Sequence, residues 1–240
     1  MLNPDSDRLF ARYSSQPQPL TLALQRMSPA LDELALKFLI WARQSERDCA
    51  DIGCGDGLTA AALVARGGRV VALDPDENAL HSLRRKIPPV QHRRLKTCVG
   101  RLPSVDFKAA HFAAIYVARV LHCLNVSDFE QSLRKFFRWA YPDGKLFISA
   151  LTPLGAFWQP FGPEFQRRRA AGLRWPGYIE DPSQFFPQET GAATSIHLLD
   201  EFVLCRELVS AGFIIEEVKC SPLPWDREQV CCAAIARCKP

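Results

Sequence analysis

A turn with three glycines separates a short apolar run from an alanine-rich segment in the first half of the chain. The run covers residues 49–52, the turn is Gly53-Cys54-Gly55-Asp56-Gly57, and residues 59–66 have the composition of a helix. A strand that turns sharply on glycines into a helix is a unit of an open α/β sheet. Such a turn lies at the carboxyl ends of the strands, where these sheets hold their ligands.

The rest of the chain alternates in the same way. Apolar runs at residues 69–73, 95–99, 113–118 and 145–150 predict further parallel strands, because strands buried on both faces are continuously apolar. Helical patterns predict the crossovers, over residues 76–86, 127–140 and 200–211 and before the first strand. The sequence therefore predicts an α/β fold, a doubly wound Rossmann-like seven-stranded mostly parallel sheet with an antiparallel C-terminal hairpin, residues 213–218 and 230–236.

Two helix starts can be predicted from capping residues. Ser28 and Pro29 have the types favoured at an N-cap and at the first helical position, ahead of an apolar face that continues to Ala42. Ser127 and Glu130 have the spacing of a capping box, so we expect the helix before the fifth strand to begin at Ser127.

Charge and cysteine content exclude several classes of protein. A charged fraction of 23% and a net charge of +4 are ordinary for a soluble enzyme and argue against a dedicated nucleic-acid binder. The nine cysteines include no Cys-x-x-Cys pair suited to zinc, and we expect no metal site. Their odd number favours free thiols in a reducing cytoplasm, with Cys49, Cys98 and Cys232 packed in the core. Without a long apolar run we also expect neither export nor a membrane segment.

Two aspartates define the ligand that the glycine turn would accept. Asp74 follows the second strand and is placed to accept both hydroxyls of a ribose, which indicates an adenosine group. The spacing is Gly-x-Gly-x-Gly rather than the dinucleotide pattern. Asp51 would repel a diphosphate but attract an ammonium or sulfonium, a difference of a few kcal/mol, on the order expected at intermediate dielectric. We therefore expect S-adenosylmethionine rather than NAD, with its carboxylate on the amides of the turn.

The motif Asp-Ile-Gly-Cys-Gly-x-Gly, with Asp74, Leu121-His122 and the turn at residues 141–145, resembles the class I S-adenosylmethionine-dependent methyltransferases, particularly their small-molecule branch. The resemblance covers residues 49–150. Arg101 departs from it, since the family usually has an acidic residue there. The resemblance implies that S-adenosylmethionine is the cofactor and that it is bound by Asp51, Gly53, Cys54, Gly55, Gly57, Asp74, Pro75, Arg101, Leu102 and Ala118.

The same resemblance suggests how the chain is organised. We expect residues 1–240 to form a single class I methyltransferase domain, with N-terminal cap helices over residues 1–45 and an inserted substrate lid over residues 151–199. Residues 151–190 hold eight of the 24 aromatic residues in a sixth of the chain, too many for a solvated linker. The alternative is a cap that only packs on the sheet or on another subunit.

Methyl transfer to a hydroxyl needs a base, and two histidines are candidate catalytic residues. His122 follows the fourth strand, and its other interpretation is a hydrogen bond to a loop carbonyl. His197 could face the ligand or anchor the cap. Four aromatic residues are candidates for binding the substrate: Tyr13, Trp158, Trp175 and Tyr178.

The predicted function is a methyltransferase that acts on oxygen or nitrogen of a small molecule. The alternative is a protein- or RNA-directed methyltransferase that docks through the basic clusters at residues 84–86, 92–94 and 167–169. A cofactor-binding scaffold without activity is a third interpretation. We expect a small-molecule partner and no membrane partner, and the sequence leaves open a monomer or a homodimer.

Overall fold

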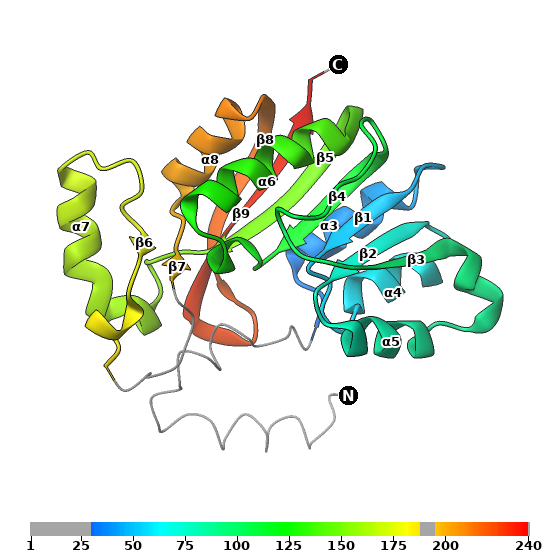
Figure 1. Cartoon of the computed structure of the whole chain (residues 1–240), viewed down its shortest axis with the longest axis horizontal. Coiled ribbons are helices and arrows are strands. Elements are labelled where there is room, and N and C mark those ends of the chain that lie inside the picture. The colour runs from blue at the N-terminus through cyan, green and yellow to red at the C-terminus, as the bar shows by residue number, and fades with distance from the viewer. Residues whose placement is uncertain (1–29, 188–194, 240) are drawn as a thin grey trace.

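A computed structural model describes residues 30–187 and 195–239 and contains one large sheet (Figure 1). Its seven strands have the order β3-β2-β1-β4-β5-β9-β8, and β9 is antiparallel to both of its neighbours. The predicted fold class is confirmed. The strands are β1 (Cys49–Ile52), β2 (Val70–Asp74), β3 (Leu95–Val99), β4 (Phe112–Ala118), β5 (Ala140–Leu151), β8 (Phe213–Leu223) and β9 (Asp226–Cys238).

Helices cover both faces of the sheet, so the structure has three layers. On one face lie α3 (Glu33–Ala42), α4 (Leu58–Ala65) and α5 (Glu77–Lys86), and on the other lie α6 (Val126–Trp139) and α8 (Glu201–Ser210). The strands alternate between the two cores: Cys49 belongs to the first, Ala50 and Ile52 to the second. No helix among these described elements is long and apolar enough to cross a membrane.

The two predicted helix starts differ from the structure. Ser28 and Pro29 lie outside the described residues, and α3 begins after Asp32, whose carboxylate accepts a hydrogen bond from the amide of Ala35. The predicted N-cap at Ser127 is wrong. Asn125 caps α6 because its side-chain oxygen accepts the amide of Asp128 at 2.9 Å, and Ser127 lies in the first turn.

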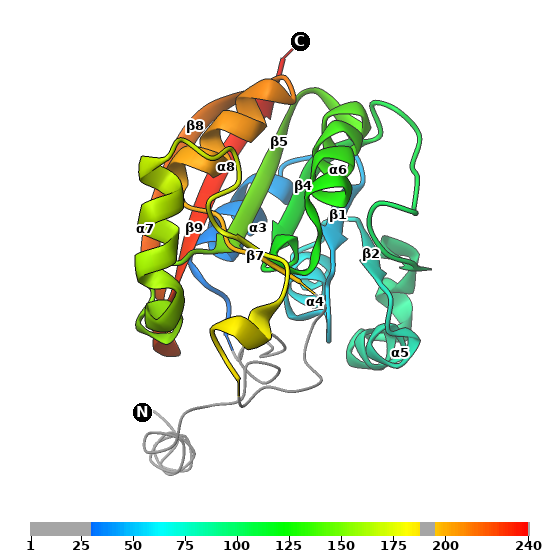
Figure 2. The ribbon, with the colours of Figure 1, turned by 60° about the vertical axis from the view of Figure 1, so that its left-hand side comes forward.

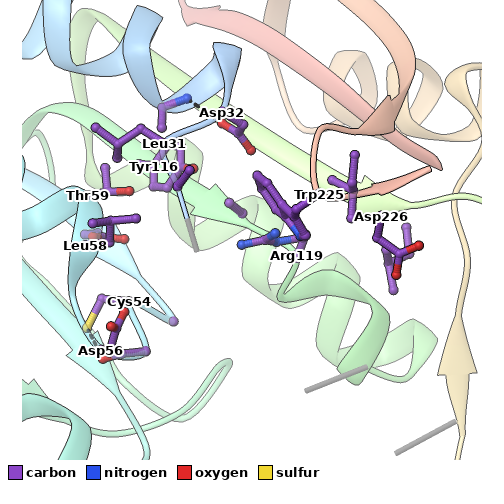
Figure 3. Close-up of a pocket in the computed structure, with 18 of the residues that line it drawn as sticks. Leu31, Asp32, Cys54, Asp56, Leu58, Thr59, Tyr116, Arg119, Trp225 and Asp226 are labelled. Atoms are coloured by element: carbon purple, nitrogen blue, oxygen red, sulfur yellow. Dashed lines mark hydrogen bonds between the residues drawn. The ribbon is translucent and has the colours of Figure 1, made fainter. Parts of the chain in front are cut away.

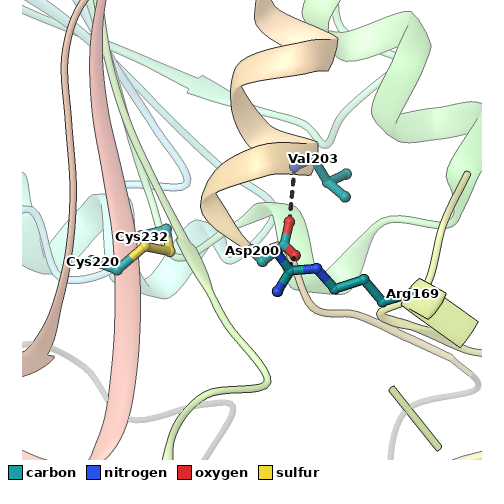
Figure 4. Close-up of a disulfide and its surroundings, with 5 residues drawn as sticks. All are labelled: Arg169, Asp200, Val203, Cys220 and Cys232. Carbon is teal, nitrogen blue, oxygen red and sulfur yellow. Dashed lines mark hydrogen bonds and ion pairs between the residues drawn. A yellow bond between two sulfur atoms is a disulfide. The ribbon is translucent and has the colours of Figure 1, made fainter. Parts of the chain in front are cut away.

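The C-terminal hairpin is longer than predicted, because β8 and β9 continue until only Pro224 and Trp225 separate them. Cys220 and Cys232 are directly opposite in this ladder and form a disulfide with a Cα–Cα distance of 4.0 Å (Figure 4). The prediction that Cys232 is a free core thiol is therefore wrong. Sequence patterns do not give the register that brings these two residues together.

The aromatic segment, residues 151–199, forms a small third core together with Leu223 and Cys231 of the β8–β9 hairpin. Its described elements are η3 (Ala156–Phe161), α7 (Gly162–Ala170), β6 (Tyr178–Ile179), η4 (Pro182–Gln184) and β7 (Ile196–His197). Figures 1 and 2 both draw α7 at the outer edge of the molecule, away from α4 and α5. The segment is joined to α8 at Asp200, which accepts the amide of Val203 at 2.8 Å and lies 3.9 Å from Arg169 of α7 (Figure 4).

Candidate functional site

A cavity of about 160 Å³ opens where the carboxyl ends of β1 and β4 meet the tip of the β8–β9 hairpin (Figure 3). One wall is the glycine turn between β1 and α4, and a second is the segment that leads into α3. The hairpin tip forms a third. The side chains that line these walls include Leu31, Asp32, Asp51, Cys54, Asp56, Thr59, Tyr116, Arg119, His122, Trp225, Asp226 and Gln229.

The glycine turn needs its glycines. Gly53 and Gly57 have φ angles of 68° and 77°, in the left-handed region that side chains disfavour. A Cβ at Gly53 would lie 2.3 Å from a methyl carbon of Val120, and one at Gly57 would lie 2.4 Å from a methyl carbon of Leu83. The turn can therefore pass close to α5 and to the end of β4 only with glycine at these positions.

Three amides of this turn, those of Gly53, Cys54 and Gly55, are already used by the neighbouring strand. Those of Gly53 and Cys54 both donate to the carbonyl of Leu73, at 2.7 and 3.0 Å, and that of Gly55 donates to the Asp74 carboxylate at 2.8 Å. The expectation that these amides are free to hold a ligand carboxylate is therefore wrong. The cause is β2, which ends beside the turn and supplies the acceptors.

Asp51 places a buried carboxyl group in the wall of the cavity. Its side chain is buried, and its Oδ2 atom has no hydrogen-bond partner in the described part of the chain. Burial raises the pKa of this carboxyl to about 7, and the nearby carboxylates of Asp74 and Asp56 add to the rise. A buried carboxylate oxygen without a partner is costly, and a bound cation would relieve that cost. This side of the cavity therefore fits an ammonium or sulfonium group.

Asp74 lies one strand further along, outside the cavity lining. Its two carboxylate oxygens accept the amides of Asp76 and Gly55, at 2.9 and 2.8 Å, which fixes the carboxylate beside the turn. Of the predicted cofactor residues, the structure brings Asp51, Gly53, Cys54, Gly55 and Ala118 together in the cavity lining. It leaves Gly57, Asp74, Pro75, Arg101 and Leu102 outside it, and Leu102 is buried in the core below α6.

The two candidate catalytic histidines have different surroundings. His122, in η2 (Leu121–Cys123), is buried and lines the cavity. His197 is fully buried outside the lining, with edge-on ring contacts to Phe129, Trp175 and Tyr178. Burial lowers the pKa of His197 to about 4. Its environment is that of a neutral core histidine, which fits the anchoring interpretation better than the catalytic one.

Three of the four aromatic residues predicted to bind the substrate are described, and none of these three lines the cavity. Trp158 is fully buried against Phe157 and Phe186, and Trp175 and Tyr178 surround His197. Tyr13 lies outside the described residues. Trp158 lies in a small core of its segment and Trp175 packs against the main core beside Phe129 of α6, because a large apolar ring gains more from burial than from exposure.

Several residues that line the cavity were missed from the sequence, among them Arg119 and Trp225. Arg119 follows β4 directly, and its guanidinium carbon lies 4.9 Å from the centre of the Trp225 ring. Trp225 is in the two-residue turn between β8 and β9. Turns of this kind favour small and polar residues, so a tryptophan there was a signal of a special role. An arginine at the ligand-binding end of a buried strand was another.

Comparisons with known proteins agree with this geometry. Residues 50–148 match the family model described as "Methyltransferase domain". A methyltransferase from Methanosarcina mazei is 18% identical over 87% of this chain and 98% of its own, with a TM-score of 0.63. The 1,6-didemethyltoxoflavin-N1-methyltransferase of Burkholderia thailandensis is 16% identical over 100% and 92%, with a TM-score of 0.60. No curated protein matches at a significant level.

The shared fold does not by itself define the chemistry. The [4+2]-cyclase SpnF is 14% identical over 90% of this chain and 86% of its own, with a TM-score of 0.61. The assignment therefore depends on the family-model match, which contains the glycine turn, Asp51, Asp74 and the strands β2, β3 and β4. Residues 50–148 of this chain therefore match a methyltransferase domain, and the fold around them is that of S-adenosylmethionine-dependent methyltransferases, which supports S-adenosylmethionine as the cofactor.

Proposed function

We propose that this enzyme methylates an oxygen or nitrogen atom of a small molecule that binds in the cavity between the glycine turn and the hairpin tip. The observation that carries the proposal is the composition of that one cavity. Its lining brings Asp51 and the glycine turn together with His122, Arg119 and Trp225. A donor and a small acceptor would meet between them. The 1,6-didemethyltoxoflavin-N1-methyltransferase, which has this fold and was crystallised with bound 1,6-didemethyltoxoflavin and S-adenosylhomocysteine, supports this interpretation.

Asp51 and the turn would hold the cofactor. The Asp51 carboxylate, buried and with one oxygen unpartnered in the described structure, would pair with the positive charge of the ligand. Asp74 keeps lone pairs beyond the two amides that it accepts, and these could take the ribose hydroxyls. When bound, S-adenosylmethionine supplies an electrophilic methyl group, and the displacement leaves the electron pair of the broken bond on sulfur.

The remaining chemistry belongs to residues of the chain. An acceptor oxygen or nitrogen forms the new bond to carbon with its lone pair, and its proton must leave. We assign His122 as the base that takes this proton, because it is the histidine in the described cavity lining. Much of the rate would come from orientation and from the exclusion of water by the three walls, since a displacement at a sulfonium needs alignment more than strong acid–base help.

The basic clusters give little support to a protein- or RNA-directed activity. Arg167 and Arg168 both form ion pairs with Glu164, and Lys86 pairs with Asp56. Charges that are paired within the chain are less available to phosphates. Filter binding of RNA at increasing salt tests this alternative directly: tight binding that falls steeply with salt would favour it over the small-molecule proposal.

The proposed function is tested by a methyl-transfer screen of a metabolite library with labelled S-adenosylmethionine, followed by mass analysis of the products. We expect a labelled small-molecule product with the wild-type enzyme and none with Asp51→Asn. Glu77→Gln, on the exposed side of α5, is the matched control and should retain activity. Label found only in protein or RNA would contradict the small-molecule assignment.

A further inference from the structure

Arg119 places a positive charge in a cavity whose other charged side chains are acidic. It is the only lysine or arginine among the described lining residues, which include Asp32, Asp51, Asp56 and Asp226. Its Nη1 atom is buried and has no hydrogen-bond partner in the described part of the chain. A buried guanidinium nitrogen without a hydrogen-bond acceptor raises the free energy of the folded state, because nothing replaces the water that it has lost. The cavity therefore has one cation whose bonding is incomplete.

The backbone of Arg119 and the Trp225 ring fix the position of the side chain without using the N–H groups of its guanidinium. Its backbone has a φ of 56°, and its amide donates to the carbonyl of Ser149 at 3.0 Å. The guanidinium then lies over the ring of Trp225 at 4.9 Å (Figure 3). Contact with the face of a ring leaves the N–H groups in the plane of the guanidinium free for another partner. Trp225 thus orients the group toward a ligand.

A carboxylate is the partner that fits this group best. The planar fork of a guanidinium matches the two oxygens of a carboxylate and holds them with two parallel hydrogen bonds. We propose that Arg119, supported by Trp225, is the carboxylate-binding residue of the cavity. This inference depends on the proposed function, since it concerns the ligands of the same site.

Two carboxylates would have access to Arg119, and their chemistry is the same. One is the methionine carboxylate of the cofactor, because the amides of Gly53, Cys54 and Gly55 are already used by β2. The other is a carboxylate on the acceptor, whose apolar part would lie against Leu151 and Leu223 of the same cavity. The two sources can be separated by ligands that differ only in the carboxylate.

The first arm of the test uses calorimetry with S-adenosylhomocysteine and its decarboxylated analogue, S-adenosyl-3-thiopropylamine, which keeps the ammonium group. If the cofactor supplies the carboxylate, the wild-type enzyme should prefer S-adenosylhomocysteine by about tenfold or more. Arg119→Met should reduce this preference to within about twofold. Arg227→Met, which removes an exposed charge from the same hairpin, should leave it unchanged.

The second arm uses matched acids and amides with saturating S-adenosylhomocysteine: 4-hydroxybenzoate with 4-hydroxybenzamide, and hexanoate with hexanamide. If the acceptor supplies the carboxylate, the acids should bind about tenfold or more tightly than the amides, and Arg119→Met should remove the difference. Arg119→Lys, which keeps the charge and loses the fork, should retain only part of it. Thermal unfolding checks that each variant is folded, and Arg119→Gln replaces the methionine variant if that one is not.

The inference is overturned if the wild-type enzyme discriminates in neither arm, or if Arg119→Met keeps the discrimination that the wild type shows. A loss of discrimination in either arm supports it and identifies the source. Failure of the proposed function is a different result, in which the wild type binds neither cofactor analogue. The acids and amides without cofactor would then still decide the role of Arg119.

Discussion

The aromatic segment and the β8–β9 hairpin differ in how their tryptophans are buried. Trp158 and most of the aromatics of residues 151–199 lie in or against a core that this segment shares with Leu223 and Cys231 of the hairpin. The hairpin has a single tryptophan in its turn, and Trp225 forms a wall of the cavity beside Arg119. A high aromatic content therefore marks a buried core here, whereas one aromatic residue in an unusual position marks the candidate site.

The largest expected effect concerns stability in the aromatic segment. Trp158→Ala should lower the free energy of unfolding by about 3 to 5 kcal/mol, because a fully buried indole leaves a cavity. Urea unfolding measures it. Trp225→Ala, which removes the same indole, should cost less than Trp158→Ala because Trp225 is only partly buried. Equal losses in the two variants would contradict the comparison.

Asp51 should make the wild-type enzyme less stable as the pH rises. Its folded pKa of about 7 lies above the ordinary value of 3.8, so the folded state binds the proton more tightly. The contribution of the protonated carboxyl to the free energy of unfolding is fully present below about pH 4. It decreases by up to about 4 kcal/mol as the pH rises to 7. Unfolding of the ligand-free enzyme at pH 5 and 8, with Asp51→Asn for comparison, measures it. The asparagine variant should lack this loss, and the same loss in both proteins would show that Asp51 is not its source.

His197 should produce the opposite pH dependence in its aromatic surroundings. Its folded pKa of about 4 lies below the ordinary 6.5, so the unfolded state binds the proton more tightly. The contribution of neutral His197 to the free energy of unfolding is fully present above about pH 6.5. It decreases by about 3 kcal/mol as the pH falls to 4. His197→Phe should remove this acid-side loss and retain methyl transfer. Loss of activity with normal stability would instead support a catalytic role for His197.

The smallest effect concerns the contact between Trp225 and Arg119. Trp225→Ala should weaken the preference for the carboxylate-bearing ligand by two- to fivefold, since a cation–π contact contributes about 0.5 to 1 kcal/mol. Trp225→Phe retains an aromatic face and should lose less. Calorimetry with the matched ligand pairs measures both variants, and an unchanged preference in Trp225→Ala would exclude orientation of Arg119 by this ring.

Local sequence patterns predicted the parts of the fold that are determined locally. The bounds of β1 and β3 were predicted to the residue, and the glycine turn was expected because its composition permits few other structures. Asp51 and His122 were placed at the carboxyl ends of strands, and the structure has both of them in the cavity lining. These predictions depend on neighbouring residues and on the general topology of open sheets.

The remainder depends on contacts between distant parts of the chain. Trp225 reaches Arg119 only because the hairpin is long enough to extend its turn over the end of β4, and strand length is not a local property. The pairing of Cys220 with Cys232 depends on register. The amides of Gly53 and Gly55 are not free because β2, a separate strand, supplies their hydrogen-bond acceptors. Each of these required the pairing of the strands to be known.

The most direct measurement of the central claim is calorimetry of the wild-type enzyme with S-adenosylmethionine, S-adenosylhomocysteine and NAD. A buried carboxylate beside a glycine turn favours a positively charged adenosyl ligand and disfavours a diphosphate. We therefore predict binding of both sulfur compounds at one site, weakened by Asp51→Asn, and no detectable binding of NAD. Binding of NAD without a response to either sulfur compound would contradict the account.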